Sequence, residues 1–401
     1  MPSPVPPATA RTLHDLAPAG TDPDRDPAAV HAHLREQGPV HRIHVPGTGD
    51  AWLVVGRTEA RAALTDPALS NDIRHCGSWS DDGGHALGRN MLQTDPPEHT
   101  ALRAGVARHF TPARVAALRP RVQEIAAELV AALPRSGGVD LVAAFAMPLP
   151  VTVICELLGV PAEDRAAVRE WSRDLVTPDS AAAARSAAAA MTAHFDRMLV
   201  HKREHPGDDL FSALTAPDTG APLAPEDLLG MCFLLLVAGH ETTVNLISGA
   251  FHALLSRPEL LASVRADPSL LAGVVEETLR FHSPVSAAAF RYAAEDTRIA
   301  DTPVPRGDAV LVSLAAAGRD PEHWPEPEVF DPRRARSGHL GFGHGVHHCL
   351  GAPLARAEAV AALTELLAAR PALRLAVAPD ALRWRSSTLL RGLAELPVRF
   401  D

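Results

Sequence analysis

The sequence has little cysteine and no excess of basic residues. Its 401 residues include four cysteines, and none forms a Cys-x-x-Cys pair, which excludes a disulfide scaffold and a cysteine-rich zinc site. The formal charge of −10 excludes a general nucleic-acid binder, because such a protein needs a basic face. A local basic patch for a small acidic partner remains compatible with this charge.

The sequence also lacks a signal peptide and a plausible membrane span. The N-terminal residues MPSPVPPATA have neither the basic region nor the apolar core of a signal peptide. The most apolar stretches, Leu141–Val160 and Met231–Gly239, are interrupted or too short to cross a bilayer. We therefore expect a cytoplasmic protein that does not bind membranes.

Helical patterns dominate the chain, and we find neither an internal repeat nor an obvious linker. The clearest helices are expected within residues 111–133, 160–205 and 225–256. Short strand patterns occur in four places, residues 39–45, 51–56, 309–317 and 396–400. Because the strands come from both ends of the chain, we predict a mainly α protein with a small β component. Residues 21–401 are expected to form a single domain, preceded by a poorly ordered, proline-rich segment over residues 1–20.

The longest helical pattern starts at Pro225 and runs to Ser256, roughly 45–50 Å at 1.5 Å per residue. It is apolar on most sides near its middle, so it must be buried. Within it lies AGHETT, Ala238 to Thr243, where a glycine, an acid and two threonines each disfavour a buried helix. Such violations of local rules often mark function, although a simple interruption of the helix would look the same.

Glu277 and Arg280 form a second feature, because they lie one helical turn apart and share a face. An exposed ion pair is common at this spacing. Apolar neighbours, among them Val274, Leu279 and Phe281, favour instead a buried pair with a structural role.

The most unusual cysteine is Cys349, in the loop FGHGVHHCLG at residues 342–351. A helical pattern follows until Pro371, so the thiol would lie near a helix N-terminus, which favours a thiolate. A zinc site would have to use neighbouring histidines without a second cysteine, and a nucleophile would need a base that the sequence does not identify. Ligation of haem iron needs only one cysteine and fits best.

At this point the chain resembles a known family, the soluble bacterial cytochromes P-450, which are haem-thiolate monooxygenases. The cysteine loop, AGHETT and the Glu-x-x-Arg pair in EETLR each resemble a family motif. DPPEHTALR (95–103) and RDPEHWPEPEVFDPRR (319–334) also match and stand in family order. The resemblance covers about residues 30–400 and implies the single-domain cytochrome P-450 fold, with haem b between the long central helix and the helix after the cysteine loop.

The resemblance also implies roles for individual residues. Cys349 would be the metal ligand, with Phe342 and Gly351 beside the haem and Ala238 and Gly239 lining the oxygen pocket. Glu241 and Thr242 would be catalytic, relaying protons and holding the bound oxygen. Two sets of residues complete the site. The haem propionates would be bound by His99, Arg103, Arg291 and His347, and a structural network would join Glu277, Arg280 and Arg334.

The expected reaction inserts one oxygen atom of O2 into a hydrophobic small molecule, by hydroxylation or epoxidation, in bacterial secondary metabolism. Electrons would come from a ferredoxin and a ferredoxin reductase, with docking at arginines around the cysteine loop. Residues 71–92 are expected to form a mobile lid. The substrate is expected to contact Met91, Leu92, Leu234, Val237, Val285, Leu389 and Leu390.

Two alternatives keep the same fold. The chain could be a non-catalytic module that recruits other enzymes, or a haem-thiolate enzyme that uses peroxide or catalyses a rearrangement. The intact Cys349, Glu241 and Thr242 argue against both. Turnover that depends on ferredoxin and NAD(P)H, and not on peroxide alone, would distinguish them.

Overall fold

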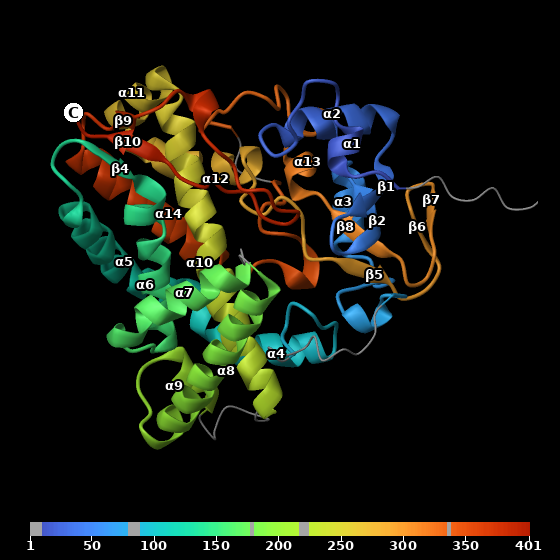
Figure 1. Cartoon of the computed structure of the whole chain (residues 1–401), viewed down its shortest axis with the longest axis horizontal. Helices are drawn as coiled ribbons and strands as arrows, with labels where there is room; N and C mark the ends of the chain where they lie inside the picture. The colour runs from blue at the N-terminus through green and yellow to red at the C-terminus, as the bar shows by residue number, and fades with distance from the viewer. Residues whose placement is uncertain (1–9, 79–88, 177–179, 216–223, 335–337) are drawn as a thin grey trace, which may run out of the picture.

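The computed structural model describes residues 10–78, 89–176, 180–215, 224–334 and 338–401, and within them the chain is mainly helical (Figure 1). The α-helices are α1 (Leu13–Leu16), α2 (Pro27–Gln37), α3 (Arg57–Ala63), α4 (Glu98–Ala107), α5 (Pro112–Ala132), α6 (Pro148–Leu158), α7 (Arg165–Val176), α8 (Ala181–Glu204), α9 (Leu210–Thr215), α10 (Pro225–Leu255), α11 (Pro258–Ala266), α12 (Leu271–Phe281), α13 (Leu314–Gly318) and α14 (Ala352–Ala369). The strands are β1 (Val40–Val45), β2 (Gly49–Val54), β3 (Leu69–Ser70), β4 (Gly138–Asp140), β5 (Arg291–Ala293), β6 (Thr297–Ile299), β7 (Thr302–Val304), β8 (Ala309–Val312), β9 (Arg374–Leu375) and β10 (Pro397–Arg399).

Helix α10 forms the centre of the helical layer. It packs against α6, α12 and α14. Met231 and Phe251 on this helix are fully buried, and burying an apolar side chain of this size contributes roughly 1.5–3 kcal/mol. The segment Asp227–Leu255 is long and apolar enough to cross a membrane, but 67% of its most apolar window is buried inside the protein, as expected of a core helix.

The long helices begin and end close to where the sequence places them. Thr111 accepts a hydrogen bond from the backbone N–H of Arg114, 3.4 Å away, and Pro112 occupies the first turn of α5. Helix α14 follows the cysteine loop and ends at Ala369, before Pro371. The predictions of these helices are confirmed.

The sheet differs from the expectation in two ways. The five-stranded sheet has the order β1-β2-β8-β5-β3, whereas the C-terminal strand β10 pairs with β4 and β9 in a separate sheet. The predicted strand at residues 309–317 is wrong beyond Val312. Ser313 caps helix α13 there, accepting from the N–H of Ala316 at 3.0 Å, and the alanines that follow favour a helix over a strand.

The N-terminal part of the chain is more structured than its composition suggests. Residues 1–9 lie outside the described residues. Arg11 bridges Ile43 of β1, and Thr12 and Asp15 form a reciprocal capping box on α1. Within the described residues, regular structure is present from Arg11 onward.

Figure 1 shows the five-stranded sheet with α1, α2 and α3 on one side of the molecule and helices α5, α6, α10 and α14 on the other. Helix α12 connects the two parts, because it contacts both α10 and α13. The buried ion pair lies on this helix.

Glu277 on α12 contacts two arginines. Its Oε1 atom lies 2.7 Å from Nη2 of Arg280 and 3.2 Å from Nε of Arg334, and Oε2 lies 2.9 Å from Nε of Arg280. Arg280 also donates to the carbonyls of Gly318 (2.7 Å), Pro327 (3.0 Å) and Val329 (3.1 Å). The Arg280 side chain is 1% exposed. These bonds tie α12 to the long loop that precedes the cysteine.

Two glycines allow this loop to approach α12 closely. A Cβ atom on Gly318 would lie 2.2 Å from the carbonyl oxygen of Arg280, and a Cβ atom on Gly273 would lie 2.0 Å from that of Pro332. Any larger residue would push the backbones apart and lengthen the bonds that Arg280 makes.

We predict that Glu277→Ala destabilises the protein strongly, because it leaves Arg280 buried without its carboxylate. The expected loss is about 3–5 kcal/mol of the free energy of unfolding, measured by denaturant titration. The matched control is Glu124→Ala, which removes an exposed carboxylate three residues from Arg121, at 3.1 Å. The control should lose at most about 1 kcal/mol. Equal losses in the two variants would contradict a structural role for the buried network.

Candidate active site

A cavity of about 550 Å³ lies between the middle of α10 and the cysteine loop. This volume is typical of ligand sites, and the walls are mostly apolar. The lining comes from the start of α4, α10, the segment after α12, the cysteine loop with the start of α14, and the C-terminal loop. Every residue that the sequence assigns to catalysis, cofactor or substrate lines this one cavity.

Cys349 is placed by the turns of its loop. Gly343 and Gly345 have φ angles of +71° and +74°, which larger residues rarely adopt. The backbone N–H of Cys349 donates to the carbonyl of Phe342 at 2.9 Å, which closes the loop. Its sulfur accepts from the backbone N–H groups of Gly351 and Ala352, at the N-terminus of α14.

Burial and neighbouring groups shift the pKa of Cys349 in opposite directions. Burial raises the pKa of the thiol, whereas the two N–H donors and the nearby Arg103 and Arg356 lower it. A bound cation would stabilise the thiolate outright. The net effect is a raised pKa, so the thiolate depends on a bound metal ion, and the two N–H donors would then temper its charge.

A polar group of side chains lies beside the cysteine. The imidazole rings of His99 and His347 are 4.4 Å apart between centroids. Both nitrogens of His99, Nε2 of His347 and Nε of Arg291 are buried without a hydrogen-bond partner. Burial, with His99 and Arg291 nearby, lowers the pKa of His347 to about 4. Buried donors without partners are rare, so this group is suited to acidic substituents of a ligand.

Hydrogen bonds to backbone carbonyls position the side chains of Arg291 and Arg103. Arg291 donates to the carbonyls of Leu69 and Leu64, both at 3.1 Å, and Arg103 donates to that of His348 at 2.7 Å. Together with the cysteine and the apolar walls, these residues fit the haem that the sequence implies. His99, Arg103, Arg291 and His347 would hold its acidic groups.

The α10 wall carries the catalytic candidates. Thr242 donates from Oγ1 to the carbonyl of Ala238 at 3.2 Å, and the helix continues without interruption. Gly239 lies against α6: a Cβ atom there would be 2.8 Å from Cδ1 of Ile154. Its small size therefore lets α10 pack closely on α6 where it lines the cavity.

Glu241 is held by residues that the sequence did not single out. Its Oε1 atom pairs with Nη1 of Arg385, and Nη2 of Arg385 donates to Oδ1 of Asn245 at 2.6 Å. Arg385 lies in an irregular C-terminal loop with no periodic pattern, so nothing in the sequence indicates this contact.

Glu358 on α14 is a second residue that the sequence reasoning missed. It lines the cavity, is 1% exposed, and has no partner for Oε2. Burial raises its pKa to about 8, which favours the neutral carboxyl. Its spacing of four residues from Leu354 places it on the apolar face of α14, and this is the signal that could have found it.

The apolar candidates come together from distant segments. Val285 and Leu390 form an isolated bridge, and the backbone N–H of Met91 approaches the sulfur of Met231 at 3.4 Å. The predicted lid at residues 71–92 is described only at its two ends, and residues 79–88 lie outside the described residues. At those ends, Asn71, Met91 and Leu92 line the cavity.

The chain is similar to many characterised proteins. A family model described as Cytochrome P450 matches residues 189–369. The Cytochrome P450 monooxygenase PikC of Streptomyces venezuelae is 50% identical over 96% of this chain and 94% of its own length. The 6-deoxyerythronolide B hydroxylase of Saccharopolyspora erythraea is 42% identical over 93% and 95%. The tirandamycin C-bound structure of the P450 monooxygenase TamI is 44% identical, with a TM-score of 0.89 over 95% of this chain and 99% of that one.

We predict that His99→Phe weakens haem binding without destabilising the apoprotein. An aromatic ring is kept, but the N–H donor for an acidic group is lost, and a hydrogen bond to a charged group contributes about 1.5–3 kcal/mol. The expected loss of affinity is about tenfold to a hundredfold, measured by haem titration, while the unfolding midpoint of the apoprotein stays equal or rises.

His194→Phe is the control, because His194 is also buried with an unpartnered nitrogen but lies outside the cavity. Its haem affinity should be that of the unmodified protein. Unchanged haem affinity in His99→Phe would contradict the assignment of this residue.

Proposed function

The chain belongs to the cytochrome P450 family and is a haem-dependent monooxygenase, and we propose that it inserts one oxygen atom of O2 into a hydrophobic polyketide. The observation that carries this proposal is the arrangement of the cavity. A single cysteine with backbone donors lies on one side, a threonine and a carboxylate lie on α10, and apolar side chains form the remaining walls.

When bound, haem supplies the redox chemistry of O2 activation, and a cysteine ligand favours cleavage of the O–O bond. Cys349 is the residue that would bind the iron, and the N–H groups of Gly351 and Ala352 would stabilise its negative charge. We propose haem b, held without covalent attachment, because Cys349 is the only cysteine among the described residues that lines the cavity.

Thr242 and Glu241 are suited to moving protons into the cavity. The Thr242 hydroxyl can turn from the Ala238 carbonyl, 3.2 Å away, and donate toward the cavity. Glu241, the preceding residue, also lines the cavity, and Arg385 orients its carboxylate. We propose that Glu241 passes protons to the region of the Thr242 hydroxyl when its carboxylate exchanges Arg385 for water.

The electrons are proposed to come from a ferredoxin and its reductase. Arg103 and Arg356 lie beside the cysteine loop. The guanidinium of Arg356 is 4.5 Å from the ring centroid of Phe342, and Arg103 bonds to the carbonyl of His348. An acidic ferredoxin surface would approach this side, and salt should weaken the attraction.

The proposed substrate class rests on the apolar walls and on the relatives. The side chains proposed to contact the substrate offer few polar partners, so binding is driven mainly by burial of apolar surface. These residues are Met91, Leu92, Leu234, Val237, Val285, Leu389 and Leu390. A similar protein is named for hydroxylating 6-deoxyerythronolide B. A screen of polyketides for a low- to high-spin shift of the haem identifies the substrate needed for the next measurement.

We predict that Thr242→Ala uncouples the reaction. Without the hydroxyl, protons are delivered less specifically, so NAD(P)H is consumed and peroxide is released at the expense of product. With ferredoxin, reductase and the substrate found by the screen, the product formed per NAD(P)H should fall about tenfold, within the range that proton-transfer groups contribute.

Ser248→Ala is the control, since Ser248 also lies on α10 and donates to the carbonyl four residues earlier, at 2.8 Å, but does not line the cavity. Its coupling should be unchanged. Full coupling in Thr242→Ala would contradict the proposed role of this residue in proton delivery. Turnover with peroxide but not with ferredoxin would contradict the proposed electron donor.

A further inference from the structure

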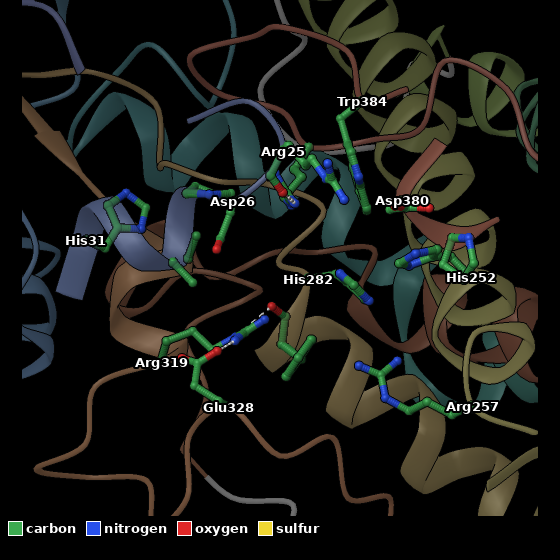
Figure 2. Close-up of a pocket in the computed structure, with 16 residues that line it drawn as sticks. Arg25, Asp26, His31, His252, Arg257, His282, Arg319, Glu328, Asp380 and Trp384 are labelled. Carbon is green, nitrogen blue, oxygen red and sulfur yellow. Dashed lines mark hydrogen bonds and ion pairs between the residues drawn. The ribbon is translucent and has the colours of Figure 1, made fainter. Parts of the chain in front are cut away.

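A second cavity of about 370 Å³ lies at the junction of α2, α10, α12 and α13, and it shares no lining residue with the active site. Its walls come from segments far apart in the sequence. The N-terminal residues 25–31, the ends of α10 and α12, residues 315–328 and the C-terminal residues 379–391 all contribute. Figure 2 shows the labelled side chains around a central space, with His31 on one side and His282 and His252 on the other.

Basic side chains dominate the interior of this cavity. Four arginines and three histidines line it, against three acids, Asp26, Glu328 and Asp380. The three acids are exposed at the rim, whereas Arg319, His31 and His282 are buried. Exposed carboxylates are screened by solvent, so they offset the buried cations only in part.

Three of the four arginines form no ion pair with a carboxylate of the described residues. Among the described residues, only Arg319 forms an ion pair, with Glu328, whose side chain is 63% exposed. Arg391 donates to the backbone carbonyls of Asp24 and Arg25, each at 2.9 Å, and Arg257 donates to that of Ala253 at 3.0 Å. Arg25 is exposed at the mouth of the cavity.

The histidines have hydrogen-bonding atoms that nothing in the described chain satisfies. Nδ1 of His31, Nδ1 of His252 and Nε2 of His282 are buried without partners. His282 is 7% exposed and His31 is 5% exposed. Because buried polar atoms nearly always have partners, three such nitrogens around one cavity give it the capacity to form hydrogen bonds with a bound ligand.

Aromatic rings form one part of the wall. Trp384 stacks on His282, with centroids 5.7 Å apart and an interplanar angle of 29°. The guanidinium of Arg391 lies 4.0 Å from the Trp384 ring centroid, and that of Arg319 lies 3.3 Å from the Phe281 centroid. These contacts hold the arginines in place, and Trp384 contributes an aromatic ring to the lining of the cavity.

The surrounding charges agree with this geometry. Burial lowers the pKa of His282 well below its ordinary value, with further lowering from His252, Arg391, Arg319 and Arg257. Burial, Arg257 and Arg391 lower that of His252 to about 4. Carboxylates act in the opposite direction on the arginines: Glu328 and Asp26 raise the pKa of Arg319, and Asp26 and Asp24 raise that of Arg391, although burial keeps both pKa values below the ordinary one. An anion placed here would be attracted to the buried arginines and would favour protonation of the histidines.

We propose that this second cavity binds the oxyanion of a small metabolite, a carboxylate or a phosphate carried on a compact, partly planar frame. The histidine N–H groups and Arg25 would donate to the oxyanion, and Trp384 would contact the frame. The site is separate from the haem cavity. The nearest link between them is a hydrogen bond of 3.0 Å from the backbone N–H of Arg391 to the carbonyl of Pro284, which lines the haem cavity.

The test is isothermal titration of the full-length, haem-loaded protein with inorganic phosphate, phenyl phosphate and benzoate, at constant ionic strength in chloride. At least one probe should bind saturably with one site per chain, and the Soret band should not change. The stronger of phenyl phosphate and benzoate identifies the oxyanion.

Two variants test whether the probe binds in this cavity. Arg25→Gln should weaken it about threefold, because this side chain is exposed and partly screened, and His282→Phe should weaken it about tenfold while keeping the stacking on Trp384. Arg135→Gln, which removes an exposed arginine elsewhere, and His194→Phe should bind as the unmodified protein does. The proposal is overturned if no probe binds saturably, if both cavity variants bind with unchanged affinity, or if binding shifts the Soret band.

Discussion

The buried carboxylate of Glu277 is the contact on which the active site depends. It pairs with both Arg280 and Arg334, and the two guanidinium groups also bind backbone carbonyls of the segment at residues 318–329. This loop leads to the cysteine loop, where Gly341 lies so close to the Leu279 carbonyl that a Cβ atom would be 2.8 Å from it. The position of Cys349 against α10 therefore follows from an ion pair on α12.

The candidate metal ligand and the candidate proton-transfer groups lie on different sides of the cavity. Cys349 and its N–H donors lie on one side, and Glu241 and Thr242 lie on α10. The polar group at His99, His347 and Arg291 contains donors that a ligand must satisfy. Because the remaining walls are apolar, a hydrophobic substrate can bind without competing for these donors.

Local signals in the sequence were sufficient to place the long helices and to pick out motif residues that line one cavity. Thr111 with Pro112 starts α5, and the apolar run after Pro225 specifies α10. Strands of two or three residues, such as β3 and β9, have no detectable pattern, because their pairing partners decide them. The strand prediction at residues 309–317 was wrong for a similar reason, because the Ser313 cap, and not the apolar pattern, decides where β8 ends.

The contacts of Glu241 and the second cavity could not be predicted at all. Arg385 and Asn245 meet only because the C-terminal loop folds back onto α10. His31, His252 and His282 lie on three different helices or their ends, and each alone looks like an ordinary buried histidine. Long-range assembly of this kind leaves no periodicity or spacing in the sequence.

The claim that Cys349 ligates haem iron is tested most directly by the absorption spectrum of the reduced, CO-treated protein. The unmodified protein and Cys155→Ser should show the strongly red-shifted Soret band of a thiolate-ligated haem, and Cys349→Ser should lose it. Cys155 is a suitable control because it is fully buried and does not line the cavity. A haem-loaded protein without this band, or a band that survives in Cys349→Ser, would contradict the account.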